Sequence, residues 1–309
     1  MTRKLNERVS KRVGQGCLTV KYNLNNKALF KNLVIRAISG AVFVALIISS
    51  ILVPTPFYFG GLFLAIVLLG LREFYSLAGK MPQVNVSWTL PMLSGAVLFS
   101  AVFGNAFLYT PKAVDYLVYA LYALLISAVF VMELFRKQEN PIKNIAVSLM
   151  GQFYIVIPIC AMLFLKAEEP MYLLAFFVTI WASDTGAYLT GMCFGKHKMF
   201  ERVSPKKTWE GLFGGFVFAL ISGYVFSLVT AETVARPLWC WIFFAVVVFA
   251  AGTLGDLIES LFKRTLNVKD SGNIMPGHGG VLDRFDSALL AAPLATAVAF
   301  LVFKALIFI

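Results

Sequence analysis

Charged residues are scarce in this sequence. Asp, Glu, Lys and Arg make up 14% of its 309 residues, whereas a soluble globular protein carries about 25%. Apolar residues reach 59%, above the roughly 45–50% of such proteins. Water therefore cannot be the main solvent of this chain, which excludes a soluble domain folded around one large core.

Histidine and cysteine are also rare, with two and four residues. Cys17, Cys160, Cys193 and Cys240 show no CxxC pairing, and three of them lie in or beside apolar stretches. Neither a disulfide framework nor a zinc site is indicated. A P-loop is absent too, because the run that begins at Gly191 reads GMCFGKH and lacks the required spacing and Ser or Thr.

Long apolar stretches dominate what is present. Several are about 20 residues long, which is enough for a helix to cross a hydrocarbon core. The sequence predicts an all-α, polytopic integral membrane protein with about nine transmembrane helices. The predicted spans are 33–53, 57–78, 88–108, 114–135, 143–165, 171–192, 210–230, 238–258 and 286–306. Glycines in the second span and Asp256 in the eighth leave open a helix that is broken or lines a cavity.

The positions of the basic residues orient the chain. Lys and Arg outnumber Asp and Glu by 27 to 16. If the N-terminus is cytoplasmic, all but four of them fall on the cytoplasmic side, as the positive-inside rule requires. The four exceptions are Lys112, Lys166, Arg236 and Lys304. This pattern predicts a cytoplasmic N-terminus and an external C-terminus, and it explains the net charge of +11 without nucleic acid as a partner.

The chain divides into two parts. Residues 1–32 are polar and basic without an apolar stretch, so they indicate a cytoplasmic arm rather than a signal peptide. Basic side chains in such an arm bind weakly to anionic headgroups. Residues 33–309 form the predicted multi-helix membrane domain.

An ionisable group inside an apolar span is informative, because each costs at least a few kcal/mol at the bilayer centre. Asp184 lies near the middle of a predicted span, within the segment WASDTGAY. A pairing with a neighbouring helix would explain it structurally. Further acidic residues on the same side of the membrane favour a place in a functional site.

The segment SPKKTWEG stands at the entrance to a later span. Ser204 or Thr208 can cap the following helix, and a helix N-terminus beside Lys206 and Lys207 attracts phosphate. Two lysines alone are ordinary topology signals. The combination with Pro, Thr and Glu is more specific.

The end of the eighth span carries a charged stripe. Asp256, Ser260 and Lys263 stand at i, i+4 and i+7, which is one face of a helix. The stripe fits an ion pair at the interface. It also fits a site in which Asp256 binds a metal while Lys263 and Arg264 meet an anion.

The densest cluster of charges and glycines precedes the last span. Gly279 and Gly280 allow the backbone to approach a ligand closely. Asp283 and Asp286 share a face at i, i+3, and their hard oxygens suit Mg²⁺. His278 is a candidate contact for a phosphate or nucleotide.

Residues 260–286 resemble the signature of the phosphatidate cytidylyltransferase (CDP-diacylglycerol synthase) family. They read SLFKRTLNVKDSGNIMPGHGGVLDRFD. Met275 is a departure, since the family usually has Ile, Leu or Phe there. SDTGAY and SPKKTWEG also look like family motifs, so the resemblance covers residues 33–309 and leaves residues 1–32 outside.

The resemblance implies a reaction of phospholipid biosynthesis in which CTP and phosphatidate give CDP-diacylglycerol and pyrophosphate. Mg²⁺ is the implied cofactor, with room for a second cation such as K⁺. The implied partners are CTP, phosphatidate in the bilayer and membrane lipids, and a homodimer is left open. The implied place is a bacterial inner membrane, with the active site facing the cytoplasm.

The resemblance and the charge pattern assign the site residues to three groups. Metal binding is assigned to Asp184, Asp256, Asp283 and Asp286. Substrate binding is assigned to Ser204, Lys206, Lys207, Thr208, Ser260, Gly279 and Gly280. The catalytic group comprises Lys263, Arg264, Lys269, Asp270, His278 and Arg284.

Three alternatives are weighed against this assignment. A CTP-dependent lipid kinase would transfer the γ-phosphate and release CDP. A CDP-alcohol phosphotransferase is disfavoured because the chain lacks a DxxDGxxAR run. A transporter would place its acids near the midplane and show an inverted repeat, whereas most acids here cluster at one boundary and no repeat is visible.

Overall fold

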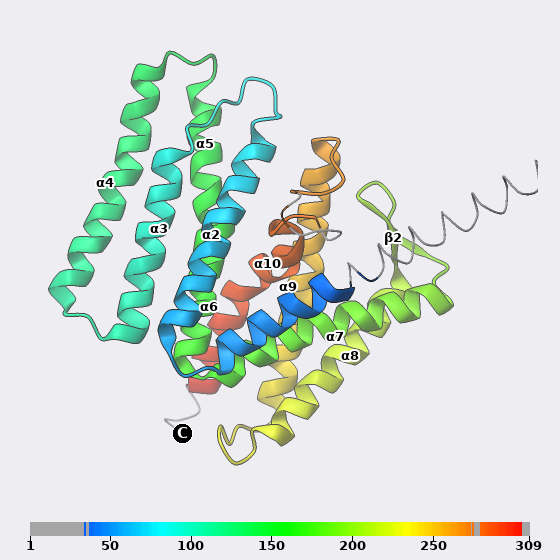
Figure 1. Cartoon of the computed structure of the whole chain (residues 1–309). Helices are drawn as coiled ribbons and strands as arrows, with labels where there is room; N and C mark the ends of the chain where they lie inside the picture. Colours follow the sequence, from blue (N-terminus) through cyan, green and yellow to red (C-terminus); the bar gives the residue numbers. More distant parts are fainter. Residues whose placement is uncertain (1–33, 35–36, 273, 275–278, 305–309) are drawn as a thin grey trace, which may run out of the picture.

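The structure, a computed structural model, describes residue 34, residues 37–272, residue 274 and residues 279–304. Within these residues, eight helices are long and apolar enough to cross a membrane. The first helix, Ala37–Leu52, is apolar but shorter. A helix therefore occupies each of the nine predicted spans, which confirms an all-α, polytopic membrane protein (Figure 1).

The remaining elements follow in chain order. The α-helices are α2 (Pro56–Ala78), α3 (Thr89–Phe103), α4 (Lys112–Arg136), α5 (Pro141–Gly151), α6 (Ile157–Glu168), α7 (Pro170–Phe194), α8 (Trp209–Val229), α9 (Leu238–Thr265) and α10 (Leu282–Val298). Three π-helical turns, η1 (Gly104–Leu108), η2 (Gln152–Val156) and η3 (Ala299–Lys304), continue α3, α5 and α10. The two strands are β1 (Lys198–Phe200) and β2 (Ser204–Thr208).

Local sequence signals mark where several helices begin. Pro56, Pro141 and Pro170 stand in the first turns of α2, α5 and α7, where the missing N–H of proline costs no hydrogen bond. Thr208 caps α8, because its Oγ1 accepts a hydrogen bond from the Gly211 amide at 3.1 Å. Of the two predicted caps, Thr208 is therefore confirmed, while Ser204 lies in β2 instead.

The two spans that could have been broken are continuous helices. α2 runs through its glycines without interruption, and α9 continues past Asp256 to Thr265. A Cβ added at Gly60 would stand 2.5 Å from the ring of Phe103 in α3. The glycine thus serves close helix packing, a common use of small residues in membrane helices.

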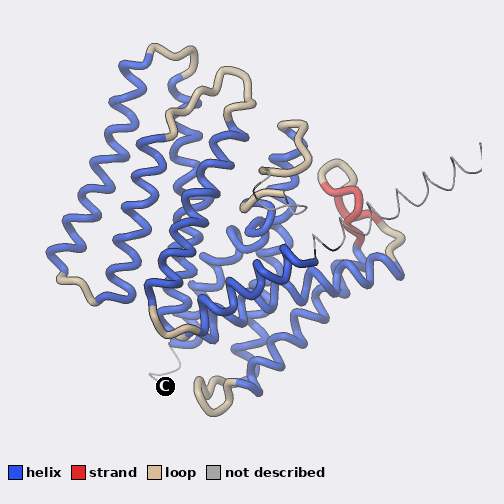
Figure 2. The backbone as a smooth tube through the Cα atoms, viewed as in Figure 1, coloured by secondary structure: helices blue, strands red, loops and turns tan. Residues whose placement is uncertain are grey.

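The helices form two groups of different inclination. In Figure 1, α2–α6 stand nearly upright, whereas the first helix, α7 and α8 cross the view obliquely. The connections after α2, α4, α7 and α9 lie toward the top of the view (Figure 2), and together with the helix ends beside them they carry most of the described basic residues. The loops after α3, α6 and α8 lie at the bottom. The predicted alternation of loops therefore agrees with the structure.

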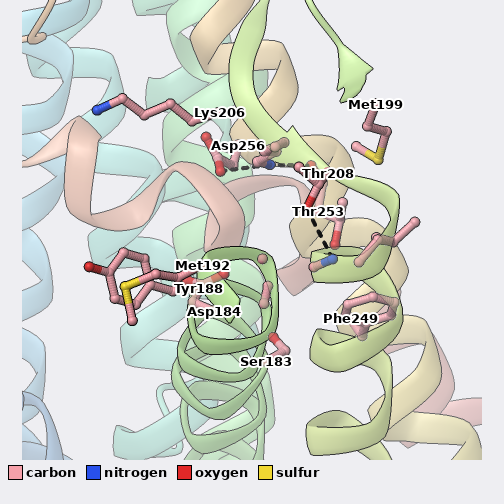
Figure 3. Close-up of a pocket in the computed structure, with 15 residues that line it drawn as sticks. Ser183, Asp184, Tyr188, Met192, Met199, Lys206, Thr208, Phe249, Thr253 and Asp256 are labelled. Carbon is pink, nitrogen blue, oxygen red and sulfur yellow. Dashed lines mark hydrogen bonds and ion pairs between the residues drawn. The ribbon is translucent and has the colours of Figure 1, made fainter. Parts of the chain in front are cut away.

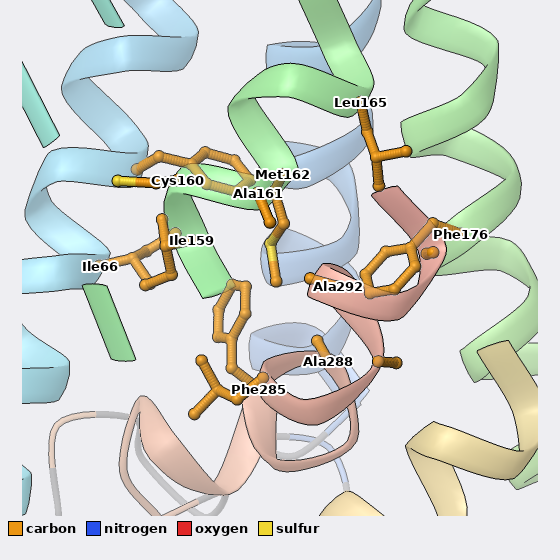
Figure 4. Close-up of a cluster of buried hydrophobic side chains, with 14 of the residues drawn as sticks. Ile66, Ile159, Cys160, Ala161, Met162, Leu165, Phe176, Phe285, Ala288 and Ala292 are labelled. Carbon is orange, nitrogen blue, oxygen red and sulfur yellow. The ribbon is translucent and has the colours of Figure 1, made fainter. Parts of the chain in front are cut away.

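An apolar cluster joins the two groups (Figure 4). Phe285 of α10 lies at its centre, with ring contacts to Phe43, Phe63 and Phe177 at centroid distances of 5.7, 6.5 and 6.1 Å. The inner face of α10 is built from buried alanines, which allow its neighbours to approach closely. This packing holds the start of α10 against α2, α7 and α9.

A small β-hairpin between α7 and α8 was not predicted. β1 pairs with β2 in antiparallel fashion, with Lys198 opposite Thr208 and Phe200 opposite Ser204. The strands are too short to give a visible alternation of apolar and polar residues, so the segment looked like a basic loop. The hairpin sets the direction in which the side chains of β2 point.

Candidate active site

Two adjoining cavities lie at the ends of α7 and α9. The first, about 430 Å³, lies among α7, β2, α8 and α9 (Figure 3). The second, about 410 Å³, lies among the first helix, α7, α9 and α10. Asp184 and Asp256 line both cavities. Two of the four predicted metal ligands, Asp184 and Asp256, therefore stand where the cavities meet.

Close packing of α7 on α8 places Asp184. A Cβ at Gly215 would stand 2.9 Å from the Ser183 carbonyl oxygen, and one at Gly211 would stand 2.9 Å from the Ala187 carbonyl oxygen. Among the described residues, the Asp184 carboxylate makes no hydrogen bond or ion pair, and it is exposed to the cavities. The structural explanation, a pairing with a neighbouring helix, is therefore not what the described residues show.

Close packing of α9 on α10 places Asp256. A Cβ at Gly255 would stand 2.6 Å from the Asp286 carbonyl oxygen, so the two backbones touch beside the second cavity. The Asp256 Oδ2 atom forms an ion pair with Lys207 Nζ at 2.7 Å. Ser260 Oγ donates to Asp256 Oδ1 at 3.3 Å. The hairpin lysine and the α9 carboxylate are thus brought together across the first cavity.

Asp256 and Lys263, which the sequence placed on one stripe of α9, bind different partners. Lys263 does not pair with Asp256; its Nζ contacts Glu259 Oε2 at 3.0 Å and Asp283 Oδ1 at 2.9 Å. The lysine therefore bridges two carboxylates, of which Asp283 lines the second cavity. Asp256 instead pairs with Lys207 and faces the cavity.

The glycine-rich loop folds around Asp283. Asp283 Oδ2 accepts hydrogen bonds from the Ser271 amide, the Ser271 hydroxyl and the Gly280 amide, each at 2.8 Å. Gly279 has a φ of +83°, and a Cβ there would stand 2.5 Å from Asp283 Oδ2. The predicted close approach of the backbone is therefore present, but toward a carboxylate of this chain.

Asp286 and Arg284 complete the second cavity. Both line it together with Ser39, Gly40, Phe43 and Val44 of the first helix. Asp283 lines it as well, but its oxygens are already engaged by four donors. The second cavity thus combines four carboxylates and one guanidinium with an apolar wall.

Several other predicted residues lie outside the two cavities. Arg264 is exposed, and its Nε donates to the Val203 carbonyl oxygen at 3.2 Å, which ties α9 to the hairpin turn. Lys269 and Asp270 are exposed in the loop after α9. His278 lies outside the described residues.

The remaining predicted substrate contacts differ in direction. Lys206 lines the first cavity, but its side chain extends away from Asp256 (Figure 3). Lys207, the next residue in β2, turns inward to Asp256. This is the alternation of a strand, and it gives the two neighbouring lysines different surroundings.

All four acids that the sequence assigns to Mg²⁺ line the second cavity. Among the described residues, no three Asp, Glu, His or Cys side chains form a ready-made metal group. Mg²⁺ is usually held by one or two carboxylates together with water and substrate phosphates. Asp184, Asp256 and Asp286 supply hard oxygens of that kind, and an incoming phosphate would complete the set.

Two buried acids near the site were missed in the sequence. Glu259 is 4% exposed and pairs with Lys263. Glu73 of α2 is 6% exposed and accepts hydrogen bonds from the loop around Asp283. Glu73 lies inside a predicted apolar span, so the rule that singled out Asp184 would have found it, whereas Glu259 lies just past the predicted end of the eighth span.

Comparison with known proteins identifies the family of the chain. The model of the cytidylyltransferase family matches residues 34–302. The chain is 34% identical to a phosphatidate cytidylyltransferase of Haemophilus influenzae over 84% of this chain and 95% of that protein. Enzymes of the same name from Staphylococcus saprophyticus and Bacillus subtilis are 40% and 49% identical over 51% and 38% of this chain, and 60% and 42% of their own lengths. The chain therefore belongs to the phosphatidate cytidylyltransferase family.

Proposed function

We propose that this protein converts CTP and phosphatidate to CDP-diacylglycerol and pyrophosphate. One observation carries the proposal beyond the family name: two cavities of similar size meet at Asp184 and Asp256. One of them is lined by basic side chains of β2 and the other by the first helix. A reaction between a soluble nucleotide and a membrane lipid needs two such compartments with a shared charged boundary.

The first cavity suits the phosphates of CTP. Lys206 and Lys207 line it directly before the N-terminus of α8, where the helix dipole favours an anion. Tyr188 and Phe249 add aromatic surface to its wall. These contacts fit a nucleotide with several negative charges.

The second cavity suits the headgroup of phosphatidate. Phe43 and Val44 give it an apolar wall, and Arg284 gives it a cation for the phosphate. The acyl chains would remain in the bilayer while the phosphate enters beside Asp286. This arrangement would keep the lipid in the membrane throughout the reaction.

The chemistry follows from the charges. An anionic oxygen of phosphatidate attacks the α-phosphorus of CTP, a new P–O bond forms, and the bond to the pyrophosphate oxygen breaks. No strong base is required, so positioning and charge neutralisation carry the catalysis. Lys207 and Arg284 would offset negative charge on the two substrates. Bound Mg²⁺, held by Asp184, Asp256 and Asp286, would neutralise further phosphate charge.

Asp283 has a supporting role in this proposal. Its oxygens accept from Ser271, Gly280 and Lys263, so a metal would have to displace the lysine. We assign it to holding the glycine-rich loop. Lys263, which joins it to Glu259, serves the same framework.

We place the reaction on the cytoplasmic side of a bacterial inner membrane. The basic loops lie at the same end of the helices as the hairpin, and cytoplasmic loops are enriched in Lys and Arg. The three relatives named above come from bacteria. CTP would then reach the first cavity directly from the cytoplasm.

Labelled CTP tests the proposal. The purified protein in phosphatidate-containing vesicles with Mg²⁺ should transfer label from α-³²P-CTP into the lipid and release pyrophosphate, and γ-³²P-CTP should leave the lipid unlabelled. Label in the lipid from γ-³²P-CTP would show a lipid kinase instead. No labelled lipid from either nucleotide would overturn the proposal.

A further inference from the structure

Glu73 lies in the middle of the framework behind the site, yet it lines neither cavity. It stands near the end of α2 and is 6% exposed. Its Oε1 accepts from the Val281 amide at 3.0 Å and its Oε2 from the Leu282 amide at 2.9 Å. We propose that Glu73 is a positioning residue that fixes the start of α10, and with it the direction of Asp286 and Arg284.

The two amides are ones that the helix cannot satisfy by itself. The first N–H groups of a helix have no partner within it, and Val281, at the N-cap of α10, supplies no side-chain cap. A carboxylate from another helix does so here. Its negative charge also suits the positive end of the helix dipole.

The loop glycines are shaped around the same carboxylate. A Cβ at Gly272 would stand 2.4 Å from Glu73 Oε1, and its three nearest atoms would all belong to Glu73. A Cβ at Gly280 would stand 2.4 Å from Glu73 Oε2. Two glycines of the segment that carries the family resemblance are thus required by a side chain about 200 residues earlier in the chain.

Ser271 connects Glu73 to the cavity wall. Its hydroxyl lies 3.3 Å from Glu73 Oε2 and 2.8 Å from Asp283 Oδ2. Asp283 begins the turn of α10 that carries Arg284 and Asp286 into the second cavity. A shift of the helix start by one residue would rotate these side chains by about 100° and remove them from the cavity wall.

The test compares Glu73→Gln with Glu133→Gln. Glu133 is also a buried glutamate in a membrane helix, 3% exposed, but it bonds Arg136 of α4 and Asn144 of α5 and none of the residues around α10. Each full-length variant is reconstituted with phosphatidate, and the kcat, the KM for CTP and the half-saturating Mg²⁺ concentration are measured. Thermal unfolding is recorded for both.

We expect Glu73→Gln to lower kcat on the order of 10- to 100-fold and to raise the half-saturating Mg²⁺ several-fold. Glu133→Gln should lower the unfolding temperature and leave both kinetic values within about twofold. Equal kinetic losses in the two variants, or unchanged Mg²⁺ dependence in Glu73→Gln, would overturn the inference.

A double-mutant cycle gives a second route. Gly272→Ala should impair activity because the new methyl group meets Glu73, and Glu73→Asp, which withdraws the carboxylate, should recover part of that loss. Strict additivity of the two changes would contradict the inference.

One readout does not depend on the reaction, since the kinetic arms rest on the proposed function. Glu73→Gln should speed hydrogen exchange at the Val281 and Leu282 amides, and Glu133→Gln should not. A wild-type protein without transferase activity would refute the proposed function alone, whereas unchanged exchange would refute the role of Glu73.

Discussion

The two halves of the molecule treat buried charge differently. In the α3–α5 half, Glu133 pairs with Arg136 and accepts from Asn144 at 3.1 Å. Asp115 accepts from Asn105 at 3.0 Å and from Thr110. In the α7–α10 half, Asp184 and Asp256 line cavities. An acid in an apolar span therefore marks a site only when its neighbours leave it facing open space.

The same contrast separates acids within the second half. Glu259 and Asp283 share Lys263, and Asp283 also accepts hydrogen bonds from the glycine-rich loop although it lines the second cavity. Asp256 also has a lysine, but Lys207 reaches it across the first cavity from strand β2. The first kind of pair holds the fold, and the second can open to admit a phosphate or a cation.

The strongest challenge to this comparison is removal of a cavity carboxylate. Asp184→Asn and Asp256→Asn should each lower the turnover of CTP by roughly 10²–10³-fold, a loss typical of removing one electrostatic contact at a reacting centre. Asp115→Asn should lower the unfolding temperature while the folded protein keeps its activity. The measurement is CDP-diacylglycerol formation per folded protein, and an equal loss in all three variants would abolish the distinction between the halves.

A smaller effect is expected from the cation that crosses the first cavity. Lys207→Met should raise the KM for CTP by about 10- to 100-fold, because a charge-assisted contact to phosphate is lost. Lys198→Met, in exposed β1 of the same hairpin, is the matched control and should leave the KM within about twofold. An unchanged KM for CTP in Lys207→Met would show that this lysine stabilises the fold and does not contact the nucleotide.

The smallest effect on activity is expected from Lys166, a buried cation that stabilises the fold and does not face either cavity. It is 6% exposed, its Nζ donates to the Ser50 carbonyl oxygen at 2.6 Å, and it lies 4.4 Å from the ring centre of Phe59. Lys166→Met should destabilise the fold by about 1–3 kcal/mol, the cost of leaving a buried group unsatisfied, with little change in KM.

Unfolding in detergent measures that loss, and Lys112→Met provides an exposed control on α4. If Lys166→Met instead changed the KM for CTP while stability held, the separation between framework and cavity charges would fail.

Most of the fold was predictable because apolar length and basic loops are local properties. The nine spans were placed from composition, and Thr208 was one of two caps predicted from their position before a span. The hairpin was missed because three- and five-residue strands carry too little pattern. The eighth predicted span ended at residue 258 because charged residues follow it, and α9 continues to Thr265, as the predicted helical stripe from Asp256 to Lys263 required.

The residues of the site were easier to predict from the sequence than the contacts between them. Asp184, Asp256, Asp283 and Asp286 were selected from their types and positions, and all four line the second cavity. The sequence did not show that Lys263 would join Glu259 and Asp283 rather than Asp256. The pair with Glu259 is an i, i+4 contact that helical periodicity allows, whereas the pair with Asp283 depends on how α10 packs against α9.

Residue types and short motifs were enough to show that this chain is a membrane protein. They also showed where along the chain the charged residues cluster and to which family it belongs. The tertiary structure alone decided which charges face open space. Helix contacts at Gly215 and Gly255, and the contact of the loop residue Gly272 with Glu73, set the distances between carboxylates and their partners. Those distances determine whether an acid is a structural pair or a place for a phosphate and its cation.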